Sequence, residues 1–146
     1  MREEACNKMN MDRLRCAKWV GSLSRERLEA DPILRKVYEA ARSSSDKRRF
    51  KVFSEALAKL TPLLQRVKAA PELEGIDMKK LREVQELYVK ALAIYMEACE
   101  LGIRQLKEQI PSQYAAIRSK VSLGDSYWEA ASAATHALSE KWFTNP

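Results

Sequence analysis

Apolar residues recur along most of the chain in alternating steps of three and four, which is the spacing of one face of an α-helix. The clearest run predicts a helix that begins at Ser45 or Asp46. Its apolar positions are Phe50, Phe53, Leu57, Leu60, Leu64 and Val67. Pro62 lies within this run. Because the apolar steps keep their phase across the proline, we expect one kinked helix; a second helix capped by Thr61 is the alternative.

The longest apolar run predicts a helix over residues 78–109, with Asp77 as its N-cap. At 1.5 Å per residue this helix spans about 48 Å. One side of it carries apolar or small residues at Leu81, Val84, Tyr88, Ala91, Tyr95, Ala98 and Gly102. A second side carries Leu87, Ile94 and Leu101. Because a helix that is apolar on two sides is covered by neighbours on both, we expect it to be the central helix of a bundle.

Turn signals divide the N-terminal part of the chain into shorter helices. The first is expected over residues 3–20 and ends at Gly21-Ser22. Asp31 then caps a second helix that continues to Ala41. Pro32 takes its first position, where a proline loses no hydrogen bond.

The C-terminal part is expected to hold two further helices. A short helix over residues 112–121 precedes a turn at Leu123-Gly124. Asp125 caps the last helix, which extends to about residue 143. The inward stripe of this helix is Trp128, Ala131, Thr135, Leu138 and Trp142.

Composition agrees with helices and excludes several classes of protein. Glycine and proline are scarce, at 4 and 5 residues, while 46% of the chain is hydrophobic. We therefore expect an all-α fold, a single-domain antiparallel bundle of about five to seven helices over residues 1–146. The apolar runs are shorter than a membrane helix needs, and 3 cysteines are an odd number for a secreted disulfide framework. A cytoplasmic protein that contacts no membrane is expected.

Charge is unevenly distributed, and this bears on partners. Residues 1–68 hold 17 Lys and Arg against 9 Asp and Glu, whereas residues 69–146 hold 9 against 11. A basic face attracts polyanions, so this half is a candidate for contact with the backbone of RNA or DNA. The residues expected to make this contact are Arg15, Lys18, Arg35, Arg42, Lys47, Arg48, Arg49 and Lys51. Trp19 is a candidate for base stacking. An ordinary solvated helix surface is the alternative.

Apolar residues outside the main seams suggest a protein interface. Leu87, Ile94 and Leu101 form the second side of the 78–109 helix, and Trp142 and Phe143 make an aromatic end to the chain. These residues either complete the core of a monomer or bind a partner. The partner is another protein or a second copy of the chain in a homodimer.

Catalytic chemistry has little support. The single histidine, His136, has mostly polar neighbours one turn away, and we expect it to be exposed and idle. Glu83 with Glu86, and Glu97 with Glu100, are similar to the paired acids of the MazG-type all-α nucleotide pyrophosphatases, which hold magnesium between two helices. A magnesium-dependent nucleotide hydrolase is therefore a minor alternative. Both pairs fall on one predicted helix about 21 Å apart, which is too far to hold one ion within one chain.

These patterns together predict a non-enzymatic helical interaction module, a small subunit or adaptor of a larger assembly. We expect no catalytic residue, metal or cofactor. Backbone-directed binding of RNA or DNA by residues 1–68 is the alternative function.

Overall fold

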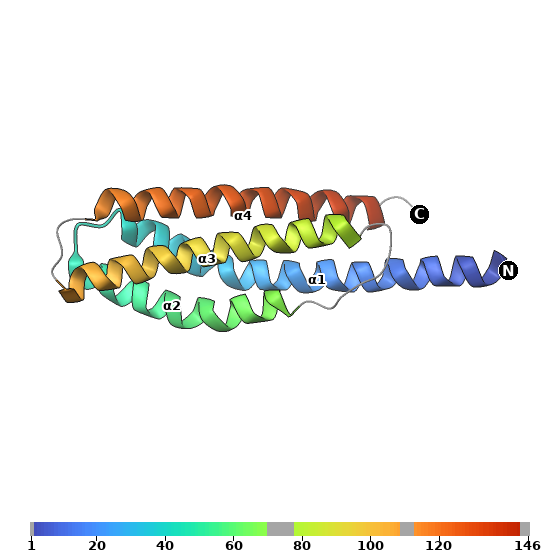
Figure 1. The fold of residues 1–146 in the computed structure, drawn as a ribbon, viewed down its shortest axis with the longest axis horizontal. Coiled ribbons are helices and arrows are strands. Elements are labelled where there is room, and N and C mark those ends of the chain that lie inside the picture. Colours follow the sequence, from blue (N-terminus) through green and yellow to red (C-terminus); the bar gives the residue numbers. More distant parts are fainter. Residues whose placement is uncertain (1, 70–77, 109–112, 144–146) are drawn as a thin grey trace.

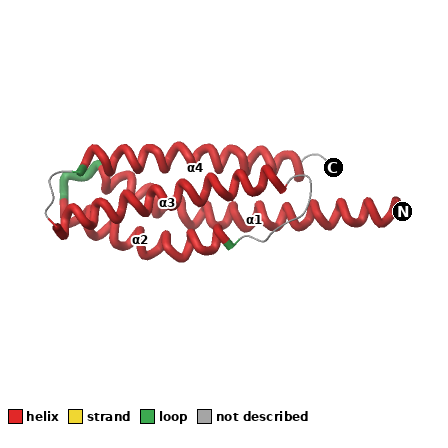
Figure 2. Tube along the Cα trace, in the orientation of Figure 1, coloured by secondary structure: helices red, strands yellow, loops and turns green. Residues whose placement is uncertain are grey.

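The computed structural model is a bundle of four α-helices (Figure 1 and Figure 2). The helices are α1 (Arg2–Ala41), α2 (Asp46–Lys68), α3 (Met78–Glu108) and α4 (Tyr114–Phe143). The structure describes residues 2–69, 78–108 and 113–143, with side chains at residues 14, 17–69, 79–108, 113–138 and 140. Within these ranges the all-α prediction is confirmed, but the count of five to seven helices is wrong. Three of the expected helix boundaries lie inside continuous helices.

Successive helices run in opposite directions (Figure 1). α1 packs against α2 and α4, and α3 packs against the same two helices, while α1 and α3 touch only slightly across the diagonal. α3 is therefore not the central helix that the sequence predicted, because each helix lies at a corner of the bundle. Buried apolar residues from all four helices form one cluster between them. The N-terminal end of α1 extends well beyond the ends of the other three helices (Figure 1).

α1 passes through Gly21-Ser22 and Asp31-Pro32, where the sequence predicted the end of one helix and the start of another. The buried residues of α1 keep one phase across both sites, in steps of three, four and seven: Val20, Leu23, Ala30, Leu34, Val37 and Ala41. A proline inside a helix costs about 3 kcal/mol. Pro32 is exposed, so water can bind the Leu28 carbonyl that lacks an amide partner. Burial of the continuous seam offsets the remaining cost.

α2 continues through Pro62 as one helix, as the unbroken apolar phase predicted. The Ser45 hydroxyl caps it by accepting a hydrogen bond from the Arg48 amide at 3.3 Å. The buried side is rotated slightly from the predicted one, since Phe50 is 38% exposed while Leu63 is fully buried.

α3 follows its prediction closely, and all seven residues of its main seam are buried. Residue 109, the expected last position, lies outside the described residues. Gly102 lies within the seam because the Phe53 ring of α2 occupies the space where a Cβ would be. In the ranges that the structure describes, no helix combines the length and the apolar content needed to span a bilayer.

α4 passes through Gly124 without the expected turn. A Cβ at this position would lie 2.9 Å from two carbons of the Tyr95 ring, which is closer than such atoms pack. Gly124 is therefore explained by contact with a ring of α3, and Asp125 lies within α4 instead of capping it.

A buried and a partly buried polar contact hold α4 against α3 and α1. The Tyr88 hydroxyl lies 3.0 Å from Thr135 Oγ1, which itself donates to the Ala131 carbonyl at 2.7 Å. The hydroxyl of Tyr88 is therefore the donor. Trp128 packs edge-on against the Tyr88 ring, and its Nε1 donates to Asp31 Oδ1 at 2.7 Å. Asp31 binds α4 in this way and does not cap a helix.

Candidate interaction surfaces

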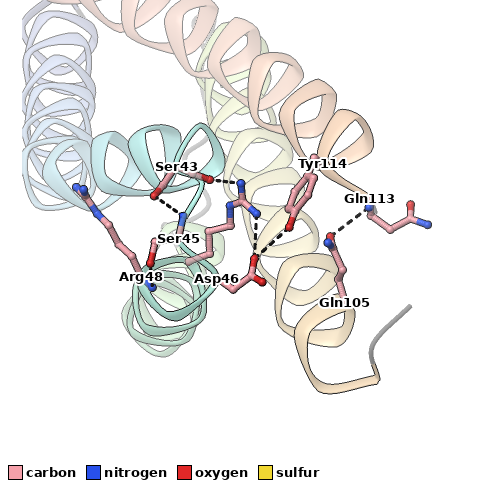
Figure 3. A network of polar contacts seen from close by, with 8 residues as sticks. Ser43, Ser45, Asp46, Arg48, Gln105, Gln113 and Tyr114 are labelled. Carbon is pink, nitrogen blue, oxygen red and sulfur yellow. Dashed lines mark hydrogen bonds and ion pairs between the residues drawn. The ribbon is translucent and has the colours of Figure 1, made fainter. Parts of the chain in front are cut away.

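Arg49, one of the eight predicted nucleic-acid contacts, is buried where the connection from α1 meets α4, and only 7% of the residue is exposed. Its guanidinium lies 3.9 Å from the centroid of the Tyr114 ring and donates to the Ser43 carbonyl. It also lies 3.4 Å from Asp46 Oδ1, which accepts a hydrogen bond from the Tyr114 hydroxyl at 3.0 Å (Figure 3). The prediction for Arg49 is therefore corrected, because this residue takes the inward position one turn before Phe53.

Further hydrogen bonds organise the same end of the bundle (Figure 3). The Ser45 amide donates to Ser43 Oγ at 3.2 Å. The Gln113 amide, just before α4, donates to Gln105 Oε1 of α3 at 3.3 Å. Together with the contacts of Arg49, these hydrogen bonds hold the segment between α1 and α2 against the starts of α2 and α4. The polar side chains of Ser43, Asp46, Arg49, Gln105 and Tyr114 at this end therefore make structural contacts.

The other predicted nucleic-acid contacts are divided between different sides of the bundle. The Arg42 guanidinium lies 4.4 Å from the Tyr38 ring centroid, and Tyr38 is one heptad from Asp31 on the side of α1 that meets α4. Arg48 lies 4.0 Å from Glu39 of α1, across the junction of α1 and α2. Arg42 and Arg48 therefore lie on different sides of α1.

Four of the predicted contacts are exposed with no acidic side chain within 4.0 Å in the described part of the chain: Lys18, Arg35, Lys47 and Lys51. The side chain of Arg15 lies outside the described residues. Trp19 is buried, so the expected stacking role is not supported. The exposed cations retain the basic character of α1 and α2.

The predicted apolar interface is largely part of the packing of α3. Leu87 and Leu101 are partly buried and pack against the core cluster, and Ile94 is also partly buried. The side chains of Trp142 and Phe143 lie outside the described residues. None of the three α3 residues is among the exposed large apolar side chains of the described chain.

Residues with catalytic or metal-binding chemistry are dispersed. The four acids of the predicted pairs are exposed on α3, and Glu97 forms an ion pair with Lys120 at 3.2 Å. The side chain of His136 is 74% exposed, as expected, and its Nε2 lies 3.1 Å from Glu140 Oε1. Among the described residues, no three His, Cys, Asp or Glu side chains are grouped so that they could hold a metal ion.

Cys99 is buried in α3 as a free thiol. Burial, with a smaller contribution from Glu100, raises the pKa of this thiol to about 12. A thiol protonated at neutral pH is a poor nucleophile, so Cys99 acts as a small core residue. The side chains of Cys6 and Cys16 lie outside the described residues.

A groove of about 520 Å³ runs between α1 and α2 on the outer side of the bundle. Its α1 wall is Glu29, Pro32, Ile33 and Lys36, and its α2 wall is Val52, Glu55, Ala56, Ala58, Lys59 and Pro62. We call this the α1–α2 groove. Sequence reasoning missed it, although both helix-internal prolines of the described chain line it.

The outward side of α1 forms a ridge beside this groove. We define the α1 ridge as seven exposed residues in alternating steps of four and three: Leu14, Lys18, Gly21, Arg25, Leu28, Pro32 and Arg35. Leu14 is 58% exposed and Leu28 is 64% exposed. In the sequence, Leu14 belongs to a loose three-four spacing of apolar residues with Ala17 and Val20. The spacing shows that Leu14 faces outward. Leu14 lies two heptads before the exposed Leu28, and both are out of phase with the buried Val20 and Leu23.

Comparison of the chain with protein-family models, with curated proteins and with solved structures finds no match.

Proposed function

We propose that this protein is a non-enzymatic interaction module that acts as a small subunit or adaptor of a larger assembly. The observation that carries the proposal is the extension of α1 beyond the other helices, with exposed leucines along its outer ridge (Figure 1). Isolated helical segments of about 12–15 residues are marginal in water, and most helices in proteins are stabilised by tertiary packing. A helical segment without neighbours among the described residues therefore favours a partner that supplies them.

A partner protein and a second copy of the chain are both consistent with this function. Large exposed apolar side chains that recur on one helix side are typical of interaction surfaces. The dispersed acids, the surface histidine and the buried thiol support binding over catalysis, because a catalytic site needs a nucleophile or base beside an orienting group.

Measurement of assembly tests this proposal. Leu14 and Leu28 are both changed to glutamate, and the doubly substituted chain is compared with the natural one by sedimentation over a wide concentration range. Stoichiometric partners retained on purification from the native cells are measured in parallel. We expect the natural chain to self-associate or to retain a partner, and the double variant to lose that association while its helical content stays the same. A natural chain that stays monomeric and retains no partner would contradict the proposal.

Backbone-directed binding of RNA or DNA is the second candidate, favoured by the exposed lysines and arginines without nearby acids on α1 and α2. Titration of labelled oligonucleotides at several salt concentrations tests it, since phosphate contacts give a steep dependence of affinity on salt. Reversal of Lys47 and Lys51 to glutamate should reduce the affinity, while reversal of Lys79 and Lys80 on α3 is the control for net charge. Absence of binding at low salt eliminates this candidate.

A further inference from the structure

We propose that the α1–α2 groove is the docking site for an acidic amphipathic helix of a partner protein. This inference rests on the proposed function as an interaction module and adds the position of the site and the chemistry of the partner.

The floor of the groove favours apolar anchor side chains. Ile33, Val52 and Ala56 contribute apolar surface, and the two prolines form the outer edges. The volume of about 520 Å³ lies within the roughly 300–1,000 Å³ that is typical of protein sites for small ligands. Leu28 of the α1 ridge, 64% exposed, lies one turn before Pro32 and extends this apolar surface along α1.

The charges around the groove favour an acidic partner. Lys36 and Lys59 line it, and neither has an acidic side chain within 4.0 Å in the ranges that the structure describes. Glu29 accepts a hydrogen bond from Arg66 at 2.8 Å, and the same guanidinium also pairs with Glu26 at 3.1 Å. Among the described groove residues, this leaves Glu55 as the acid without an ion pair. Complementary charge of this kind sets partner choice and orientation.

Two more exposed cations extend the positive charge beyond the groove. Arg25 lies one turn before Glu29 on α1, and Lys51 lies one turn before Glu55 on α2. A partner segment that lies along the groove would therefore meet positive charge at both ends. Acidic residues that flank an apolar stripe would match this distribution.

The partner segment is inferred to be a helix because of the backbone chemistry of the groove. Two helices line it, and their amides and carbonyls bond within each helix. An extended peptide would therefore find few partners for its own backbone groups. A helix satisfies its own backbone and packs along a pair of helices through side chains at steps of three and four. The Ala58 carbonyl, left without an amide by Pro62, offers such a helix one additional acceptor.

Nucleic acid fits this groove poorly. The apolar side chains of Ile33 and Val52 offer nothing to phosphate oxygens.

Selection from a displayed library of helical peptides tests the site. The full chain is the bait, and the library is unbiased in charge. Selected peptides are then titrated against Ala58→Trp, which fills the groove, and against Ala130→Trp, an exposed alanine of α4. We expect enriched peptides to carry apolar residues at steps of three and four with acidic flanks. Ala58→Trp should reduce the affinity of these peptides by at least about tenfold, whereas Ala130→Trp should leave it unchanged.

Charge reversal provides a second variant that leaves the groove open. The double variant Lys36→Glu with Lys59→Glu should bind the selected peptides with about tenfold lower affinity. Lys79→Glu with Lys80→Glu makes the same change in net charge on α3 and should have little effect. Circular dichroism establishes that each variant is folded.

The outcomes distinguish this site from the broader function. No enrichment of peptides, or enriched peptides that are basic or that bind both groove variants as well as the natural chain, overturns the groove proposal. Binding that protects other amides in hydrogen exchange, for example along the exposed outer side of α1 near Leu14, also overturns it while the proposed interaction function stands.

Discussion

Replacement of Gly102 by alanine should destabilise the bundle, whereas the same replacement at Gly21 should stabilise it. Both glycines lie inside helices. At Gly102 the new methyl group would overlap the ring of Phe53, which is fully buried and cannot move into solvent. At Gly21 a Cβ has no other atom within 4 Å.

The magnitudes follow from two opposing effects. Alanine gains about 1 kcal/mol over glycine in a helix, and this gain applies to both variants. Overpacking in a filled core costs about 1–3 kcal/mol, and this cost applies only at Gly102. The variants should therefore differ by about 1–3 kcal/mol in free energy of unfolding. At about 2–4 °C per kcal/mol for a chain of this size, Gly21→Ala should melt at least about 2 °C above Gly102→Ala.

Thermal and urea unfolding, followed by circular dichroism, measure both differences. A double-mutant cycle identifies the cause, because Phe53→Leu removes the ring atoms that the new methyl group meets, so Gly102→Ala should cost less in that background. If Gly102→Ala proves as stable as Gly21→Ala, the close contact between α2 and α3 is refuted.

Three further predictions concern the core and the end of the bundle. Tyr88→Phe should lower the free energy of unfolding by about 1 kcal/mol, because it removes the hydrogen bond to Thr135. Tyr95→Phe should be neutral or stabilising, because the buried Tyr95 hydroxyl has no hydrogen-bond partner among the described residues. Equal urea midpoints for the two variants would contradict this prediction. Arg49→Ala should lower the free energy of unfolding by about 1.5–3 kcal/mol, because the charged hydrogen bonds of Arg49 are lost. Replacement of an exposed lysine of α2 by alanine should change it by less than about 0.5 kcal/mol. If Arg49→Ala loses no more stability than the lysine variant, the Arg49 network does not stabilise the bundle. Cys99→Ala should be less stable than the natural chain near neutral pH, and the deficit should shrink above pH 9, measured as urea midpoints at several pH values.

The sign of the Cys99 prediction follows from its raised pKa. Below pH 9.0, which equals the ordinary pKa of a cysteine thiol, Cys99 is protonated in both the folded and the unfolded chain. Its ionisation therefore does not change the stability in this range. Between 9.0 and about 12 only the unfolded chain releases the proton. This ionisation lowers the stability of the natural chain by up to about 1.4 kcal/mol per pH unit. Alanine has no such proton, and a deficit that is independent of pH would contradict the burial of the thiol.

The candidate sites were less predictable than the helices. Surface position depends on rotation about the helix axis, and a shift of one residue rotates a side chain by about 100°. Arg49 is buried and Phe50 is 38% exposed, opposite to the sequence interpretation. The α1–α2 groove arises from two helices whose contributing residues are 16 to 33 positions apart, so no local pattern could indicate it.

The amino-acid sequence alone determined the helical class, the main seam of α3 and the continuity of α2 across Pro62. In the first two cases a regular apolar period and local propensity agree, whereas in α2 the unbroken apolar period outweighed the low helix propensity of Pro62. Only the tertiary structure decided that Gly21, Pro32 and Gly124 lie within helices. A single glycine or proline costs about 1–3 kcal/mol in a helix, and packing along a seam that keeps its phase can exceed this cost. Whether it does so depends on contacts from other helices, such as the Tyr95 ring against Gly124.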